Sequence, residues 1–218
     1  MYQTISPDNL AKYAATIDSM HRNRYVVCVR QWGWDIPGSK PGYEKDQFDT
    51  EHTVYVTVTD PDFGKVVAST RLNPTIEPHM MSELYADYCN LQPFPQRDDT
   101  WECSRYVIDR TLYHDPVKEY KIRCNLGIGM TRFCLDNGIR QLSWLTHEKF
   151  YKLTQQVWKT EPLGLPVREA DSDWAWVPAL SQIDEATNAD QRQRLANAES
   201  VVAELLRAKS IRKKSRAA

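Results

Sequence analysis

The sequence predicts an α/β fold, a single-domain three-layer sandwich built on a mixed sheet. Two strand-like runs, residues 54–58 and 65–72, flank an Asp-Pro-Asp-Phe-Gly turn and indicate an antiparallel hairpin. A strand–helix–strand pattern over residues 101–146 indicates two neighbouring parallel strands. The chain has 218 residues without repeats or a clear linker, which is enough for one well-buried domain.

The N-terminal part begins with a predicted helix and continues into a loop. Leu10, Ala14 and Ile17 follow helical spacing, and Arg24 falls near the end of that helix. Residues 33–50 contain several glycines and prolines among many charges. We therefore predict a long irregular loop there, and loops of this length in compact domains are usually functional or disordered.

The remaining elements follow in order along the chain. Pro74 ends the second hairpin strand, and Gly138 stands where the C-terminal cap of a long helix belongs. The strands in the first part of the chain are expected to pair antiparallel, and those in the later part to pair parallel. We expect a short helix at 80–88, a buried strand at 101–108, a helix at 117–137, a strand at 139–146, a helix at 147–159, a late strand at 174–180 and an exposed helix at 183–209.

The C-terminal part differs in charge from the rest. After Glu204 the chain has six basic residues and no acidic ones, although the net charge of the whole chain is −1. We therefore divide the chain into a globular domain, residues 1–182, and a C-terminal helix with a basic tail, residues 183–218. A solvated helix end explains the tail, and an acidic partner is the alternative.

The composition argues against several classes of protein. Apolar residues make up 41% and charged residues 26%, as in ordinary globular proteins. No apolar run reaches the roughly 18 residues of a membrane span, and the N-terminus lacks the pattern of a signal peptide. The five cysteines form no Cys-x-x-Cys pair and the histidines lack ligand spacing, which argues against disulfides and a metal site. We expect a cytoplasmic protein without membrane, nucleic-acid or metal binding.

The run Trp101–Tyr106, W-E-C-S-R-Y, places a carboxylate and a guanidinium inside a predicted buried strand. Charges near a core need a partner or a ligand. Upstream, Arg24, Arg71 and the pair Asp46 and Asp49 supply further charges of both signs. The pattern predicts a site in which these charges converge.

Five pieces in order along the chain carry a family resemblance: Arg24, Gly33–Trp34, Asp46 with Asp49, Arg71–Thr75 and Trp101–Tyr106. Together they resemble the acyl-homoserine lactone synthases, the bacterial autoinducer synthases of quorum sensing. The resemblance covers roughly residues 20–145 and implies a GNAT-like acyltransferase fold with a V-shaped acyl cleft. Cys28 departs from it, because the family typically has Phe at that position.

The resemblance implies an enzyme that N-acylates S-adenosylmethionine from an acyl thioester and then closes the lactone, with release of methylthioadenosine. That substrate carries a sulfonium, an ammonium and a carboxylate, so its site needs carboxylates, guanidiniums and an aromatic face. The acyl donor is acyl carrier protein or acyl-coenzyme A, and no cofactor is implied. The residues that match this substrate site are Arg24, Trp34, Asp46, Asp49, Arg71 and Arg105.

Two residues of the strand motif are candidates for catalysis. Glu102 is the candidate base that takes the proton of the substrate amine, directly or through a water. Ser104, or backbone N–H groups beside a bulge, is the candidate donor to the oxyanion. Strand alternation puts Arg105 on the opposite face from Glu102. Either a bulge brings the two together, or Arg105 is structural and pairs with Asp46 or Asp49.

Apolar side chains between the sheet and the helices are expected to set the acyl selectivity. Bulky Trp144 favours a short, branched or aromatic acyl group if it points into the cleft, and ordinary core packing is the alternative. The candidates for this pocket are Met80, Trp144 and Thr146.

Two other functions stay open. Gly127 and Gly129 lie in a run similar to the coenzyme A loop of general GNAT-type N-acyltransferases, which acylate other amines, although these glycines also suit close helix packing. The second alternative is a non-catalytic module that senses a ligand and docks a nucleic acid through its basic tail. No nucleic-acid-binding motif supports it.

Overall fold

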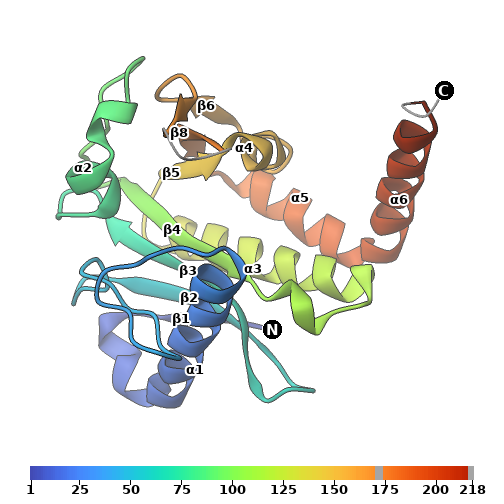
Figure 1. Ribbon diagram of the computed structural model, residues 1–218, viewed down its shortest axis with the longest axis horizontal. Helices are drawn as coiled ribbons and strands as arrows, with labels where there is room; N and C mark the ends of the chain where they lie inside the picture. Colours follow the sequence, from blue (N-terminus) through green and yellow to red (C-terminus); the bar gives the residue numbers. More distant parts are fainter. Residues whose placement is uncertain (170–173, 216–218) are drawn as a thin grey trace.

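An eight-stranded mixed sheet forms the centre of the molecule (Figure 1). The computed structural model describes residues 1–169 and 174–215, with the side chains of the last helix described as far as Ser210. The strands are β1 (Tyr2–Ile5), β2 (Val54–Asp60), β3 (Lys65–Pro74), β4 (Thr100–Ile108), β5 (Gln141–His147), β6 (Thr160–Pro162), β7 (Val167–Arg168) and β8 (Ala175–Gln182). The α-helices are α1 (Ala14–Arg24), α2 (Met80–Leu84), α3 (Pro116–Asp136), α4 (Glu148–Thr154), α5 (Glu185–Ala196) and α6 (Ala198–Ser215).

The strand order is β1-β2-β3-β4-β5-β8-β6, and β7 also pairs with β8. Only β4 and β5 run parallel among these pairs, joined through α3 as the strand–helix–strand pattern predicts. The expectation of a parallel late sheet is wrong beyond that pair, because β8 returns antiparallel to β5. The connection between them contains α4, which was predicted, and the short strands β6 and β7, which were not.

The sheet opens between β4 and β5. Their pairing covers four positions and ends at Cys103 and Trp144, whereas β5 stays paired with β8 as far as His147. The later halves of the two strands therefore separate, and β4 residues 104–108 face β5 residues 145–147 across the opening. This is the V-shaped cleft that the resemblance implies.

The two faces of the sheet differ in polarity. Val56 and its alternate neighbours point toward α3 and join the main apolar core, while Tyr55 points the other way and packs with Met20 of α1. Figure 1 shows α1 and α3 on opposite sides of the sheet. A Cβ added to Gly129 of α3 would lie 2.6 Å from the Tyr2 ring, so the glycine allows α3 to approach the sheet.

The glycines of α3 lie in the middle of a helix, so they do not form a phosphate-binding loop at a helix start. The coenzyme A loop suggested by that run is therefore not formed, and Gly129 has the packing role that was the alternative.

The C-terminal segment forms two helices, α5 and α6, where one exposed helix was expected. The break is at Asn197, and the helix faces are partly buried because Asn188 and Val202 contribute to the interior. The far end of α6 projects from the body (Figure 1). Arg216, the last basic residue of the tail, lies outside the described residues. Within the described part of the chain, no helix is long and apolar enough to cross a membrane.

Candidate active site

Polar side chains gather on the sheet face that α1 and the irregular loop cover. Arg71 of β3 is registered opposite Ser104 of β4, and Asn73 opposite Glu102. Alternation therefore puts these four side chains on one face, while Cys103 points to the apolar core with Met130 of α3. All four are buried.

A β-bulge changes the direction of Arg105. Thr70 of β3 faces two residues of β4, because the register shifts between the Ser69–Val107 and Arg71–Ser104 pairs. Arg105 has a φ of 52°, and it is the one non-glycine residue with positive φ in the part of the chain that the structure describes. The bulge turns its guanidinium toward the Glu102 face. The structure therefore contains the bulge of the first alternative, and it also contains the pairing with Asp46 that the second alternative names.

Arg24, at the end of α1, anchors one half of a buried ion cluster. Its guanidinium makes a bidentate contact to Asp49 at 2.6 and 2.9 Å and also donates to Glu44. Tyr55 donates its hydroxyl to the same Asp49 at 2.9 Å. The side chain of Arg24 is 1% exposed and that of Asp49 0%, so this half is sealed from water.

Arg71 and Arg105 form the other half of the cluster around Asp46. Arg71 donates to Asp46 at 2.5 Å and through its Nε to the Ser104 hydroxyl at 2.9 Å. Arg105 donates to Asp46 and approaches Glu44 at 3.3 Å. The side chains of Asp46 and Arg105 are each 8% exposed. This pair is therefore the part of the cluster nearest to solvent.

The cluster balances three guanidiniums against three carboxylates. Burial alone lowers the pKa of Arg24, but Asp49 and Glu44 outweigh burial and hold that pKa above its ordinary value. Burial raises the pKa of Asp49, yet Arg24 and Arg71 keep it well below its usual range. Oxygens of Glu44, Asp46 and Asp49 lie within 4.8 Å of one another, as in metal sites. Here the guanidiniums already supply the balancing positive charge.

Arg71 and Glu102 each have a buried polar atom on this face that has no hydrogen-bond partner among the described residues. Arg71 leaves its Nη2 donor unpaired, and Glu102 leaves its Oε1 acceptor unpaired. The other Glu102 oxygen accepts the backbone N–H of Met81 at 2.6 Å. An unpaired buried polar atom costs free energy, so a free donor and a free acceptor on one face indicate a polar ligand.

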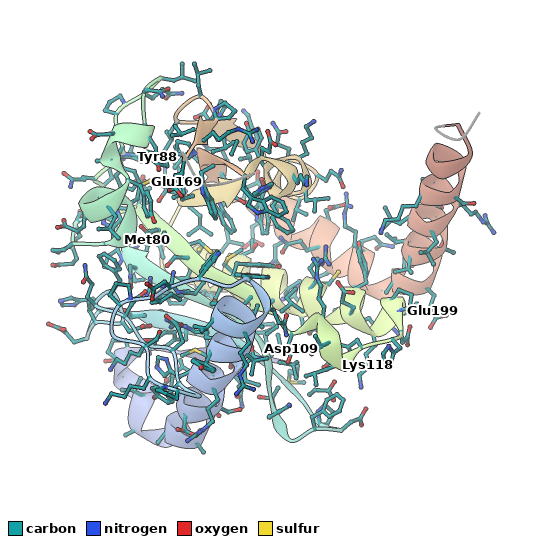
Figure 2. The ribbon with its side chains drawn as sticks, viewed as in Figure 1. Met80, Tyr88, Asp109, Lys118, Glu169 and Glu199 are labelled. Atoms are coloured by element: carbon teal, nitrogen blue, oxygen red, sulfur yellow. The ribbon has the colours of Figure 1, made fainter. Side chains whose placement is uncertain are left out.

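The segment between β3 and β4 covers this face. It contacts β4 through Met81 and reaches the β6–β7 connection, where the Leu91 N–H donates to the Leu163 carbonyl at 3.0 Å. Tyr88 donates to Glu169 at 2.9 Å, and Figure 2 shows the two side by side above Met80. The segment therefore crosses from β4 to the far arm of the cleft.

Two cavities lie beside the cluster. One of about 400 Å³ is lined partly by Phe48, whose ring faces the Arg71 guanidinium at 5.8 Å, and one of about 310 Å³ partly by Asn23. Among the described residues that line them, neither Glu102 nor Ser104 is included. Neither of these two cavities therefore opens onto the two candidate catalytic residues.

Trp34 lies where the charged cluster meets the cleft. The Arg105 guanidinium is 5.7 Å from its ring centroid, and Trp32 and Trp176 pack against it at 4.8 and 6.3 Å. An indole over a cationic site suits a sulfonium or an aromatic base.

The acyl-pocket candidates lie on different sides of the sheet. Met80 contacts Arg105 through its sulfur at 3.9 Å, on the face of the ion cluster. Trp144 is buried on the α3 side, where it packs with Trp158 at 5.3 Å and faces Tyr106 across the opening at 6.3 Å. Thr146 follows on the same side as Trp144 by alternation.

Sequence reasoning missed Glu44, a fully buried member of the cluster. Charge balance was the available signal. Three buried arginines need three anions, and the spacing of Glu44, Asp46 and Asp49 along one loop supplies the third. Nothing in the sequence indicated that the Tyr55 hydroxyl would bind Asp49. Tyr55 follows the alternation of β2 like any other strand residue.

The comparisons with known proteins identify the family. The sequence matches the family model for autoinducer synthases over residues 8–175. It is 31% identical over 174 residues to an isovaleryl-homoserine lactone synthase of Bradyrhizobium diazoefficiens, covering 76% of this chain and 73% of that protein.

Solved structures extend the comparison to the fold. Structures of a CoA-dependent acyl-homoserine lactone synthase, BjaI, one with SAM and isopentyl-CoA and one with MTA, match with a TM-score of 0.80 and 27% identity, covering 90% of this chain and 89% of theirs. A protein of Lactobacillus plantarum described as an N-acetyltransferase matches in fold alone, with a TM-score of 0.53, 16% identity and coverage of 84% and 99%. The chain belongs to the autoinducer synthase family and is an enzyme of the acyltransferase kind.

Proposed function

We propose that this protein acylates the α-amine of S-adenosylmethionine with the acyl group of an acyl-coenzyme A and then closes the homoserine lactone. The observation that carries the proposal is the unpaired Arg71 donor and Glu102 acceptor on one buried face. A substrate carboxylate fits the guanidinium, and a substrate amine fits the carboxylate. Trp34 and the Asp46–Arg105 pair border the place left for the sulfonium.

In the first step the amine attacks the thioester carbonyl. An ammonium has no lone pair, so Glu102 takes one proton before the attack and passes it to solvent. The new C–N bond forms as the C–S bond of the thioester breaks. The nitrogen loses a second proton as it becomes the amide, and that proton leaves with the coenzyme A thiol. The Ser104 hydroxyl accepts from Arg71 at 2.9 Å, so its own hydrogen is free to be donated to the oxyanion.

In the second step the substrate carboxylate attacks the carbon beside the sulfonium. The C–O bond of the lactone forms as the C–S⁺ bond breaks, and its electron pair leaves with methylthioadenosine. This step needs orientation and no protein nucleophile. Arg71 orients the carboxylate, and the ion cluster fixes Arg71.

The kind of relatives and the surface charges support coenzyme A as the acyl donor. BjaI is a CoA-dependent synthase. The basic residues of α3 that would meet an acidic carrier protein are mostly paired within the chain: Lys118 with Asp60 and Asp62, Lys121 with Glu199, Arg123 with Glu119, and Arg132 with Asp136 and Glu185.

The bulky Trp144 beside the opening supports a short or branched acyl chain. Both substrates of the proposed reaction are made in the cytoplasm, so we place the protein there.

Incubation of the purified protein with S-adenosylmethionine and isovaleryl-coenzyme A tests the proposal. We expect acyl-homoserine lactone, methylthioadenosine and free thiol in equal amounts by mass spectrometry and a thiol assay. Thiol release that depends on another amine, with S-adenosylmethionine left intact, supports a general N-acyltransferase instead. A higher kcat/KM with the same acyl group on carrier protein contradicts coenzyme A as the donor.

A further inference from the structure

His147 is a buried histidine with a hydrogen-bond donor that no described residue accepts. It ends β5 at the far side of the cleft and is 6% exposed. Its Nδ1 accepts the Lys149 backbone N–H at 3.1 Å and so caps α4. The proton of the neutral ring is therefore on Nε2, which is buried and unpaired within the described part of the chain.

The surroundings of the imidazole favour its neutral form. Burial lowers its pKa, and the nearby Lys149 lowers it further, while Glu148 opposes them. The α4 cap acts in the same direction, because a protonated Nδ1 could not accept the Lys149 N–H. His147 therefore offers a fixed, uncharged N–H donor.

An aromatic wall joins His147 to the charged cluster. Trp176, its cross-strand partner on β8, lies 6.2 Å from the imidazole and 6.3 Å from Trp34. Trp34 in turn faces the Arg105 guanidinium at 5.7 Å. Alternation puts His147 on the sheet face of Ser143, which is registered with Glu102. The wall therefore runs along the same face as the candidate catalytic residues.

We propose that this wall binds the adenine of S-adenosylmethionine, with the His147 Nε2–H donating to a ring nitrogen of the base. A purine offers flat faces to the indoles and in-plane acceptor nitrogens to a neutral donor, and no other group of that substrate combines the two. The inference rests on the proposed function, because the charged end of the same molecule occupies Arg71 and Glu102.

Trp174 lies over the imidazole at 4.0 Å and is 47% exposed.

Two histidine substitutions separate the capping role from the donor. In His147→Asn the amide oxygen takes the place of Nδ1 and keeps the cap, but the Nε2 donor is lost. In His147→Gln the amide nitrogen takes the place of Nε2 and keeps the donor, but the cap is lost. We expect His147→Asn to bind methylthioadenosine about 5-fold more weakly with an unchanged unfolding temperature. We expect His147→Gln to bind it like the wild type and to unfold at a lower temperature.

Titration calorimetry with methylthioadenosine measures the binding without the reaction. The 1-deaza, 3-deaza and 7-deaza forms of that nucleoside provide a test on the wild-type protein itself. The wild-type protein should bind one of the three deaza forms about 5-fold more weakly than methylthioadenosine. The His147→Asn variant should bind that deaza form and methylthioadenosine equally.

Equal binding of methylthioadenosine by the wild type and His147→Asn, or equal binding of all three deaza forms by the wild type, overturns the inference and leaves the proposed function standing. A rise in KM for acyl-coenzyme A alone in His147→Asn overturns it too, because the base bound there is then that of coenzyme A. A wild-type protein that does not bind methylthioadenosine contradicts both proposals.

Discussion

Arg105 and Asp46 form an ion pair that depends on a single left-handed residue. Arg105 stands one residue after Ser104 in β4, and regular alternation would point it into the apolar core. The bulge and the φ of 52° turn its guanidinium to the opposite face, where Asp46 receives it. The strained backbone is therefore part of how the cluster is assembled.

The conformation of Arg105 predicts an unusual order of stability. Both Arg105→Gly and Arg105→Ala lose the ion pair, but Gly adopts positive φ without a Cβ penalty, which is roughly 1 kcal/mol or more for Ala. We expect Arg105→Gly to be more stable than Arg105→Ala by about that amount in urea unfolding. Lys65, exposed at the start of β3, is the control position. There Lys65→Ala should be more stable than Lys65→Gly. An Ala variant as stable as the Gly variant at position 105 contradicts the left-handed backbone.

The role of Glu102 predicts a loss of turnover without a loss of structure. Gln keeps the shape of the side chain and an oxygen for the Met81 N–H, but it cannot take a proton. We expect Glu102→Gln to lower kcat by at least ~100-fold with an unchanged unfolding temperature. The exposed Glu83→Gln, in the covering helix α2, serves as control and should stay within ~2-fold of the wild type. Near-normal kcat in Glu102→Gln would remove the base from the mechanism.

The sequence predicted that charged side chains would converge. Arg24, Asp49 and Arg71 were identified because charges in a buried context need partners, and the structure brings them together. The direction of Arg105 was not decided, because φ at a bulge depends on the pairing register between β3 and β4. A local pattern contains no information on that register.

The elements with strong hydrophobic periodicity were predicted, and the short elements were missed. The hairpin and α3 were recovered almost to the residue. Strands of two to four residues, such as β1 and β7, have too few residues to show alternation, and their position depends on the neighbouring strand. The antiparallel direction of β8 likewise depends on the path of the connection after α4.

Glu44 predicts a large cost when one partner of the cluster is neutralised. It is fully buried and approaches both Arg24 and Arg105. Glu44→Gln leaves a guanidinium short of a counter-charge, so we expect a loss of about 3 kcal/mol in the free energy of unfolding. Glu51→Gln is the matched control, because the Glu51 side chain is 84% exposed, and it should change little. Equal stability of the two variants would mean that Glu44 is not part of a charged network.

His21 predicts a dependence of stability on pH. Burial lowers its pKa below the ordinary value, with Arg24 adding to the effect and Asp49 opposing it. The unfolded chain then binds the proton more readily than the folded one, so stability is lost as the pH falls through about 6.5 and toward the folded pKa.

Urea unfolding at pH 7.5 and pH 5.5 measures this loss. We expect a smaller decrease in His21→Asn than in the wild type, and an unchanged decrease in His114→Asn, because His114 is exposed. Some decrease should persist in His21→Asn, since burial also lowers the pKa of His147. The same decrease in all three proteins would show that His21 does not contribute.

The two glycines of α3 provide the last prediction, in which the same substitution has opposite effects two residues apart. A Cβ at Gly129 would lie 2.6 Å from the Tyr2 ring and 2.8 Å from Val56, so α3 or the sheet must move and Gly129→Ala should destabilise by roughly 1–3 kcal/mol. A Cβ at Gly127 meets the flexible Gln191 side chain at 3.5 Å, an ordinary contact, so the higher helix propensity of Ala should stabilise by up to about 1 kcal/mol. Thermal and urea unfolding of both variants decide the matter. Both glycines lie in the interior of the same helix, so only the close contact with the sheet at Gly129 makes the two substitutions differ. Destabilisation of equal size at both positions would therefore contradict that close contact.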